Sequence, residues 1–231
     1  MNNIKLKQVI QQFKQNLIEF ENVLDEIINE KEETLRSSVN IGDVVMKDYS
    51  IIKPNEVKDK LDEVFGVVFY VNGSDIRFMA IEKSEDSLMF KTENTSVSKR
   101  LPLYENIRDA KKDMNGKMNS EIIKDARDFT KEKYPSMGYC MDYNRFGFDK
   151  GKWYLPSIGE LEQIYDSKAE LNKTLKILGE EEITNGWYTS SSGSCANWSW
   201  WFGMYTGNVD NYYKNDFGSV YPCFSITINN Y

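Results

Sequence analysis

Two alternations of apolar and polar residues near the C-terminus predict β-strands. In the first, Trp198, Trp200, Phe202 and Met204 share one face, and Ser199, Trp201, Gly203 and Tyr205 share the other. The second predicts a final strand through Val220, Pro222, Phe224, Ile226 and Ile228. A turn at residues 206–208 and an irregular segment at residues 210–219 separate them. This register predicts burial of Trp200, Phe202, Met204, Val220, Phe224 and Ile226, and at least partial exposure of Trp201, Tyr205, Tyr212 and Tyr213.

The stretch from Gly186 to Ile226 is rich in aromatic, amide and hydroxyl side chains. It contains four of the five Trp and two of the three Cys. Tyr and Trp supply rigid contact area, and Asn and Ser supply adaptable hydrogen bonds, so this composition is typical of a binding surface. The alternative is an ordinary sheet, because Tyr and Trp also favour strands. The aromatic residues continue through the predicted irregular segment, and this favours the binding surface.

The N-terminal residues 1–38 have the pattern of one amphipathic helix. Apolar residues step alternately by four and three over about three heptads, at positions Leu6, Ile10, Phe13, Leu17, Phe20, Leu24 and Ile27. A repeat of this period predicts self-association through residues 4–30. The alternative is a helix that packs against its own domain, which also spaces its apolar residues in this way.

The middle of the chain predicts short strands followed by helices. Residues 42–45, 65–71 and 76–81 have strand patterns, and Asn72-Gly73-Ser74 predicts a hairpin turn with Asn72 and Gly73 at positive φ. Residues 84–106 are polar and give no clear pattern.

Three predicted helices follow. A helix is predicted from Ser120 to about Tyr134, ended by Pro135. Ser157 and Glu160 form a capping box at the start of another helix, and Gly179 ends the short helix after it. Strands on both sides of a central helical region indicate an α+β fold.

Composition excludes several classes of function. The chain has 231 residues, a net charge of −7 and no basic run, which argues against nucleic acid as a partner. Histidine is absent, which removes the usual general base and zinc ligand. Cys140, Cys195 and Cys223 show neither metal-site nor disulfide-framework spacing, so we expect no metal and no cofactor. No stretch approaches the roughly 20 apolar residues of a membrane span, and the N-terminus lacks a signal-peptide core, so we expect cytoplasmic synthesis without membrane insertion.

Specific motifs resemble one protein family. The tract GKWYLPSIGEL, followed by WYTSSS and by VYPCFSI, is similar to the C-type-lectin-like domain of variable proteins from gut Bacteroidales and their phages. The segments GDVV and GVVFYV and the pair YP and YC also match that family. The resemblance covers roughly residues 40–228, within a predicted domain at residues 39–231. It implies the fold of formylglycine-generating-enzyme-like proteins and phage tropism determinants.

The resemblance also implies a diversified surface, because several members are targets of diversity-generating retroelements. Residues 194–219 are dense in the products of adenine substitution, among candidate framework residues Trp200, Phe202, Met204, Gly207, Val209 and Lys214. Within a variable tract at about residues 190–223 we therefore expect these ligand-binding residues: Ser194, Cys195, Asn197, Trp198, Trp201, Tyr205, Asn208, Asn211, Tyr212, Tyr213, Asn215, Phe217 and Tyr221.

Two positions depart from the family pattern. Tyr221 replaces the usual Arg, so any ion pair made by that Arg is lost, and Cys223 replaces the usual Val, which indicates a small buried residue. The calcium-dependent sugar-binding motifs EPN, QPD and WND are absent, so the resemblance does not imply carbohydrate binding. We expect Cys195 and Cys223 to form no disulfide, and Cys140 to be buried.

These observations predict a non-enzymatic receptor-binding protein with no catalytic residues. We expect a phage tail or fibre-tip component that binds a host-surface protein or glycan receptor as a homo-oligomer, with a trimer suggested by the usual symmetry of phage fibres. Localisation is then the virion, after synthesis in the bacterial cytoplasm. The alternatives are a secreted adhesin at the bacterial cell surface, a cysteine-dependent oxidase of the formylglycine-generating kind, and a structural protein whose aromatic tract is core.

Overall fold

A computed structural model describes residues 10–24 and 39–227 of the chain. The chain divides after residue 39 into two units. The first contains a helix over residues 10–24, and the second, residues 40–226, contains every strand and the other described helices. Part of the predicted heptad pattern, including Leu6 and Ile27, lies outside the described residues. Within the described helix the heptad residues Ile10, Phe13, Leu17, Phe20 and Leu24 are exposed by 41% to 69%.

The second unit contains a five-stranded sheet with the order β10-β4-β3-β1-β2. Its strands are β1 (Val44–Met46), β2 (Ile51–Ile52), β3 (Val64–Asn72), β4 (Asp75–Met79) and β10 (Cys223–Thr227). Strands β3 and β4 form the predicted hairpin, in which Asn72 pairs with Asp75. Gly73 alone takes a positive φ, of 56°, so the expectation for Asn72 was wrong.

A three-stranded antiparallel sheet has the order β6-β7-β8. Its strands are β6 (Trp187–Gly193), β7 (Trp198–Gly203) and β8 (Asn208–Tyr213). The prediction that residues 210–219 are irregular was therefore wrong. β8 pairs along its whole length with β7, and β9 (Phe217–Gly218) pairs with β5 (Leu88–Met89). An edge strand with polar side chains lacks the apolar pattern by which a strand is recognised in sequence.

Only some helices of the second unit begin and end where the sequence predicted. They are α2 (Ile107–Ala110), α3 (Gly116–Lys124), α4 (Pro135–Asp142), α5 (Ile158–Asp166) and α6 (Lys168–Leu178), with 3₁₀ turns η1 (Pro54–Glu56) and η2 (Lys58–Glu63). The predicted helix from Ser120 to Tyr134 was wrong, since α3 ends at Lys124. Pro135 begins α4 because proline fits the first turn of a helix, where its missing N–H costs nothing.

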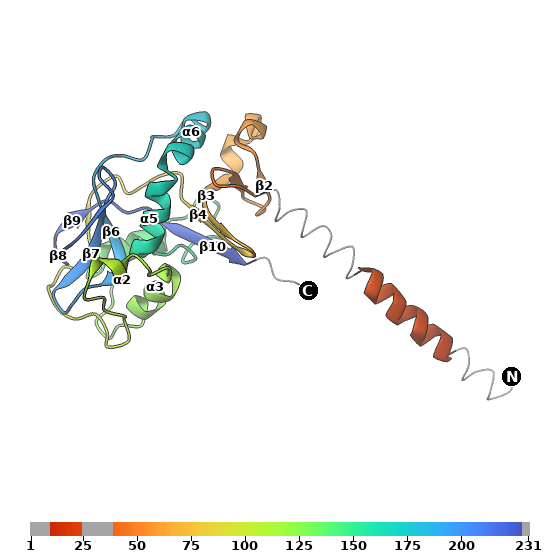
Figure 1. The fold of residues 1–231 in the computed structure, drawn as a ribbon, viewed down its shortest axis with the longest axis horizontal. Coiled ribbons are helices and arrows are strands. Elements are labelled where there is room, and N and C mark those ends of the chain that lie inside the picture. Colours follow the sequence, from red (N-terminus) through yellow and green to blue (C-terminus); the bar gives the residue numbers. More distant parts are fainter. Residues whose placement is uncertain (1–9, 25–38, 228–231) are drawn as a thin grey trace. The chain divides into compact units, whose positions relative to one another are not determined.

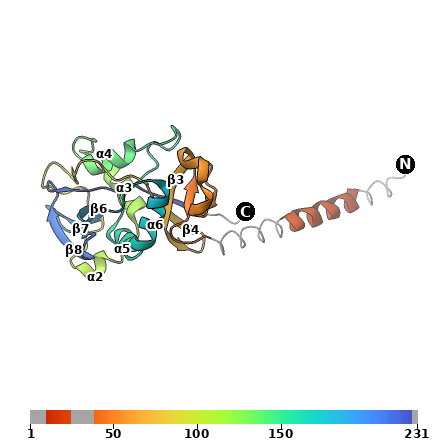
Figure 2. The ribbon, with the colours of Figure 1, turned by 90° about the horizontal axis from the view of Figure 1, so that it is seen from above.

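Helix α5 lies between the two larger sheets, in contact with β3, β6 and β7 (Figures 1 and 2). The predicted capping box of Ser157 and Glu160 is present at its start, and Gly179, at φ 77°, ends α6 as predicted. Apolar residues from both sheets and both helices form one core. The mixed α+β class is thus confirmed.

Glu160 makes α5 the centre of a buried polar network. Its Oε1 accepts hydrogen bonds from Arg77 Nη1 at 2.7 Å and from the Tyr154 hydroxyl at 2.8 Å. Its Oε2 accepts from the backbone N–H and hydroxyl of Ser157, both at 2.8 Å. Burial raises the pKa of the Glu160 carboxyl, and the guanidinium of Arg77 opposes that rise. The pKa of Arg77 is also affected by burial, which lowers it, but hydrogen bonding to Asp75 and the charge of Glu160 raise it overall.

None of the helices in the described residues combines the length and the apolar character needed to cross a membrane.

The network predicts an unequal response to the loss of two glutamates on the same helix. Glu160→Ala removes one of the two carboxylates that pair with Arg77 and leaves the buried Tyr154 hydroxyl without its acceptor, and it is expected to lower the free energy of unfolding by about 3–5 kcal/mol. Glu162→Ala removes a partly exposed ion pair with Lys111, at 2.6 Å, and should cost less than about 1 kcal/mol. Urea unfolding of both variants measures the difference, and equal losses would contradict the central role of Glu160.

Candidate ligand-binding surface

The candidate surface is built on the paired strands β7 and β8. Residues directly opposite in an antiparallel pair have side chains on the same face. The register pairs Trp198 with Tyr213 and Trp200 with Asn211. The rings of Trp198 and Tyr213 lie 4.6 Å apart at the end of the pair. Trp200 is buried, and its indole N–H donates to the Tyr104 carbonyl at 2.9 Å.

A shallow depression of about 360 Å³ lies at this end of the sheet. It is lined by four of the expected binding residues and one further carboxylate: Ser194, Cys195, Trp198, Asn211 and Glu105. The Asn211 amide donates to the Ser194 hydroxyl at 3.3 Å. Glu105 comes from the polar segment at residues 84–106, which shows no clear pattern, so only the fold reveals its place beside the other four.

The other face of β8 supplies a second group of aromatic side chains. The half-buried Tyr212 lies 5.0 Å from the ring of Trp187 and 5.3 Å from that of Trp201. Asn208 lines a separate depression with Trp187 and Lys111. Tyr205 and Phe217 are the most exposed aromatic residues of the tract, at 74% and 64%.

Eleven of the thirteen expected binding residues are exposed or half-buried, and we call these eleven the aromatic surface. They are Ser194, Cys195, Asn197, Trp198, Tyr205, Asn208, Asn211, Tyr212, Tyr213, Asn215 and Phe217. The expected burial of Trp200, Phe202, Met204, Val220 and Phe224 is confirmed, as is the exposure of Tyr205, Tyr212 and Tyr213. The expected burial of Ile226 was wrong, because it is half-buried.

The prediction of an exposed Trp201 was also wrong. Its side chain is 2% exposed, and its indole N–H donates to the Ser199 hydroxyl at 2.9 Å. A Cβ atom at Gly218 would lie 2.5 Å from the Trp201 ring. The lack of a side chain at Gly218 thus lets β9 cover the face of the sheet that the alternation had assigned to solvent.

The prediction that Tyr221 is a ligand-binding residue of this surface was also wrong. Tyr221 is 2% exposed and lies away from the aromatic surface. Its ring stacks on that of Tyr188 at 5.6 Å with an angle of 6° between the planes. It lines a cavity to which none of the eleven residues of the aromatic surface contributes.

Lys214 holds the loop before β7 in place from its buried side. It is buried, and its Nζ donates to the carbonyls of Thr95 at 3.1 Å, Cys195 at 3.0 Å and Ala196. Its backbone N–H donates to the Asn197 carbonyl at 3.2 Å. The framework role expected for this residue fits this geometry, in which one ammonium holds residues 195–196 beside residue 95.

The motifs that carry the family resemblance are structural. In WYLPSIGEL, Ser157 and Glu160 cap α5, and a Cβ at Gly159 would lie 2.5 Å from the Asp113 carbonyl. In WYTSSS, the Ser192 hydroxyl donates to Asp113 at 2.7 Å and accepts from the Ile158 N–H at 3.0 Å. These residues therefore support the surface without belonging to it.

The three cysteines are free thiols in different surroundings. Cys140 and Cys223 are fully buried, as expected, and burial raises the pKa of both thiols. Cys195 is exposed on the aromatic surface. Within the described part of the chain, no three or more Cys, Asp or Glu residues are grouped to hold a metal ion.

Comparisons with known proteins give a likeness to a solved structure. No family model matches the chain, and no curated protein matches it. Among solved structures, it is similar to a fimbrial protein from Bacteroides ovatus ATCC 8483, with a TM-score of 0.59 and 16% sequence identity. The match covers 80% of this chain and 48% of that one, so the chain spans about half the length of that protein. At this identity the likeness shows a shared fold.

Lys214 predicts a pH dependence of stability. Burial, together with the charge of Lys91, lowers the pKa of Lys214 from 10.5 to about 8. Between these values the unfolded chain binds a proton that the folded chain has lost, so this group adds stability as the pH rises through that window. Relative to Lys214→Met, the unmodified protein should gain up to about 3 kcal/mol in free energy of unfolding. Urea unfolding at pH 7 to 10.5 measures this gain, and parallel curves for the two proteins would refute it.

Proposed function

We propose that the chain is a non-enzymatic receptor-binding protein whose aromatic surface contacts a protein or glycan on a bacterial host cell. The observation that carries this proposal is the grouping of exposed and half-buried side chains at one end of the β7–β8 pair, where Trp198 contacts Tyr213 and lies beside Ser194 and Asn211. A sheet holds these side chains on a rigid base, so little conformational entropy is lost when a ligand binds.

The environments of the cysteines favour binding over oxidase chemistry. A reactive thiol needs a lowered pKa and access to substrate. Cys223 has neither, because it is fully buried and burial raises its pKa. Cys195 is accessible, but a pair of reactive thiols would require the buried Cys223 as its partner.

The N-terminal helix supports display of several copies. The heptad residues within its described part, residues 10–24, are exposed in the single chain, and a second and third copy of the helix would cover them. Several weak binding surfaces held in one particle gain avidity through effective concentration. A trimer that presents three aromatic surfaces fits a phage tail or fibre tip, with localisation in the virion.

A second candidate is an adhesin at the bacterial cell surface. The similar solved structure is that of a fimbrial protein, and this likeness favours a bacterial origin. Both candidates use the same surface, so the neighbouring genes distinguish them better than the fold does. A reverse transcriptase gene and a template repeat that differs from this gene only at adenines would favour the diversified protein.

Binding to cells tests the aromatic surface directly. The labelled full chain, added to intact cells from a panel of gut Bacteroidales, is expected to bind at least one strain. Tyr213→Ala should weaken that binding by about tenfold, since buried aromatic contacts dominate interfaces. Flow cytometry measures the loss, and protease-treated or periodate-treated cells distinguish a protein receptor from a glycan.

Ile177→Ala is the matched control, because Ile177 on α6 is 55% exposed and lies outside the tract. It should leave binding within about twofold of the unmodified chain. Equal weakening by the two substitutions, at unchanged melting temperature, would refute the assignment of the surface.

Oligomer formation through residues 4–30 is tested by charge substitution in the heptad. Leu17→Glu places a carboxylate at a core position of the heptad (position a). It should convert the predicted trimer into a monomer, because a buried unpaired charge costs several kcal/mol. Gln15→Glu adds the same charge at the outward f position and should leave the trimer intact. Light scattering measures both. A monomeric unmodified chain, or an oligomer that survives removal of residues 1–38, would contradict this prediction.

A further inference from the structure

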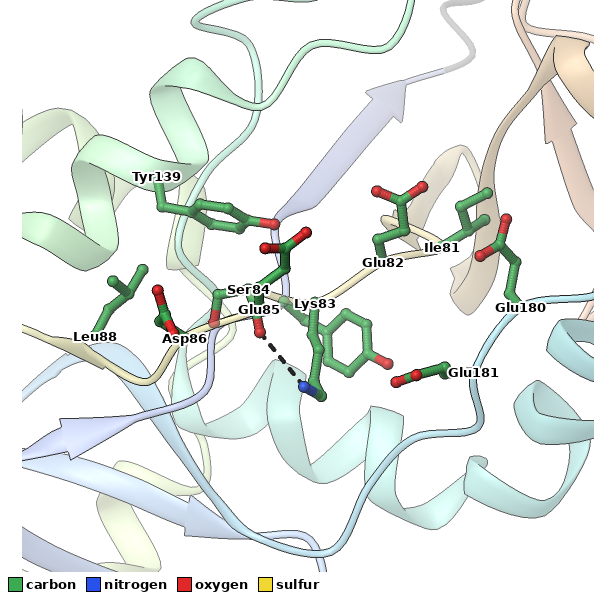
Figure 3. Close-up of a pocket in the computed structure, with 11 residues that line it drawn as sticks. Ile81, Glu82, Lys83, Ser84, Glu85, Asp86, Leu88, Tyr139, Glu180 and Glu181 are labelled. Carbon is green, nitrogen blue, oxygen red and sulfur yellow. Dashed lines mark hydrogen bonds between the residues drawn. The ribbon is translucent and has the colours of Figure 1, made fainter.

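One cavity of the second unit lies apart from the aromatic surface and has acidic walls. It has a volume of about 530 Å³. Its lining comes from residues 81–86 after β4 and Leu88 on β5, from Tyr139 on α4, from Glu180 and Glu181 after α6, and from Tyr221 before β10. Figure 3 shows Glu180 and Glu181 on one side of this space, with Asp86 and Leu88 on the other.

Five carboxylates and one ammonium line the cavity. Glu82 forms an ion pair with Arg145 at 2.9 Å. Within the described residues, no ion pair reaches Glu85, Asp86, Glu180 or Glu181, and Lys83 donates only to the Ser84 carbonyl, at 3.4 Å. Burial and the charge of Glu82 raise the pKa of Glu180, so negative charge in this cavity is left without enough compensating positive charge.

Tyr221 supplies a second and independent indication of a ligand. Its side chain is 98% buried against Tyr188, yet it lines the cavity. Its hydroxyl makes no hydrogen bond within the described part of the chain. The ring is buried while the hydroxyl is accessible only from the cavity, so a polar group on a molecule bound there is placed to pair with it.

We propose that this cavity binds an organic cation with an ammonium or guanidinium group on an apolar chain, either a free aliphatic diamine or a Lys or Arg side chain. The carboxylates would pair with the charged group, and the rings of Tyr139 and Tyr221 would contact its methylene groups and donate or accept hydrogen bonds. The carboxylates are spread around the cavity and do not converge as metal ligands would, which favours an extended cation over a metal ion.

Calorimetric titration of the full chain at low salt tests the proposal. The probes are cadaverine, Nα-acetyl-lysine methylamide and Nα-acetyl-arginine methylamide, with the Nε-acetylated lysine derivative as the matched neutral probe. At least one cation is expected to bind and the neutral probe to show no binding. Binding of the capped amino acids assigns a side chain of a peptide as the natural ligand, and binding of cadaverine alone assigns a free diamine.

Three variants locate the binding. Glu180→Gln with Glu181→Gln removes two charges from the cavity and should weaken binding by about tenfold. Asp59→Asn with Asp62→Asn removes two exposed charges outside the cavity and should change the affinity by less than about twofold. Tyr221→Phe should weaken binding severalfold at an unchanged melting temperature, because it deletes only the hydroxyl.

Three results would overturn the proposal. They are the absence of binding heat from every cation at about 10 mM, equal weakening by the two charge-removing pairs, and equal affinity for the acetylated and unmodified lysine derivatives. None of these results depends on the aromatic surface, so this proposal and the proposed receptor function fail separately.

Discussion

The ion pair between Arg77 and Glu160 connects the two larger sheets through one helix. Arg77 lies on β4, and Glu160 lies in the first turn of α5, the helix on which β6 and β7 pack. The network continues from Ser157 through Asp113 to Ser192 on β6. A buried ion pair is weak evidence for net stability, because desolvation offsets its attraction. Its effect here is on specificity, since a different placement of α5 would leave buried charges without partners.

Because this network is internal, substitutions on the aromatic surface are expected to leave it intact. Its exposed residues, such as Tyr205 and Asn215, make no contact with Glu160 or Arg77. The supports beneath them are few and buried: Gly218 admits the ring of Trp201, and Lys214 holds the loop that carries Cys195. A substitution at the surface changes the chemistry offered to a ligand, whereas a substitution at a support changes the position of the whole loop.

The sequence predicted the features that depend on neighbours in the chain and missed those that depend on distant ones. The capping box at Ser157 is complete within four residues, so it was recognised. Trp201 and Tyr221 were placed at the surface because their burial depends on Gly218 and on Tyr188, which no alternation reveals. Pro135 was given the wrong role because proline ends one helix or begins another, and only the fold decides which. The acidic cavity joins four separate segments, so no local pattern indicates it.

The separation of framework and surface also limits what likeness of fold can say about the ligand. At 16% identity, the fimbrial protein from Bacteroides ovatus shares an arrangement of strands and helices with this chain. Such an arrangement is fixed by buried contacts of the kind made by Glu160, Gly159 and Ser192, and these contacts are compatible with many different surfaces. Under the proposed function, the identity of the ligand would be encoded in side chains that the fold does not constrain, chiefly those between residues 194 and 217. One architecture can carry unrelated functions while its core remains alike.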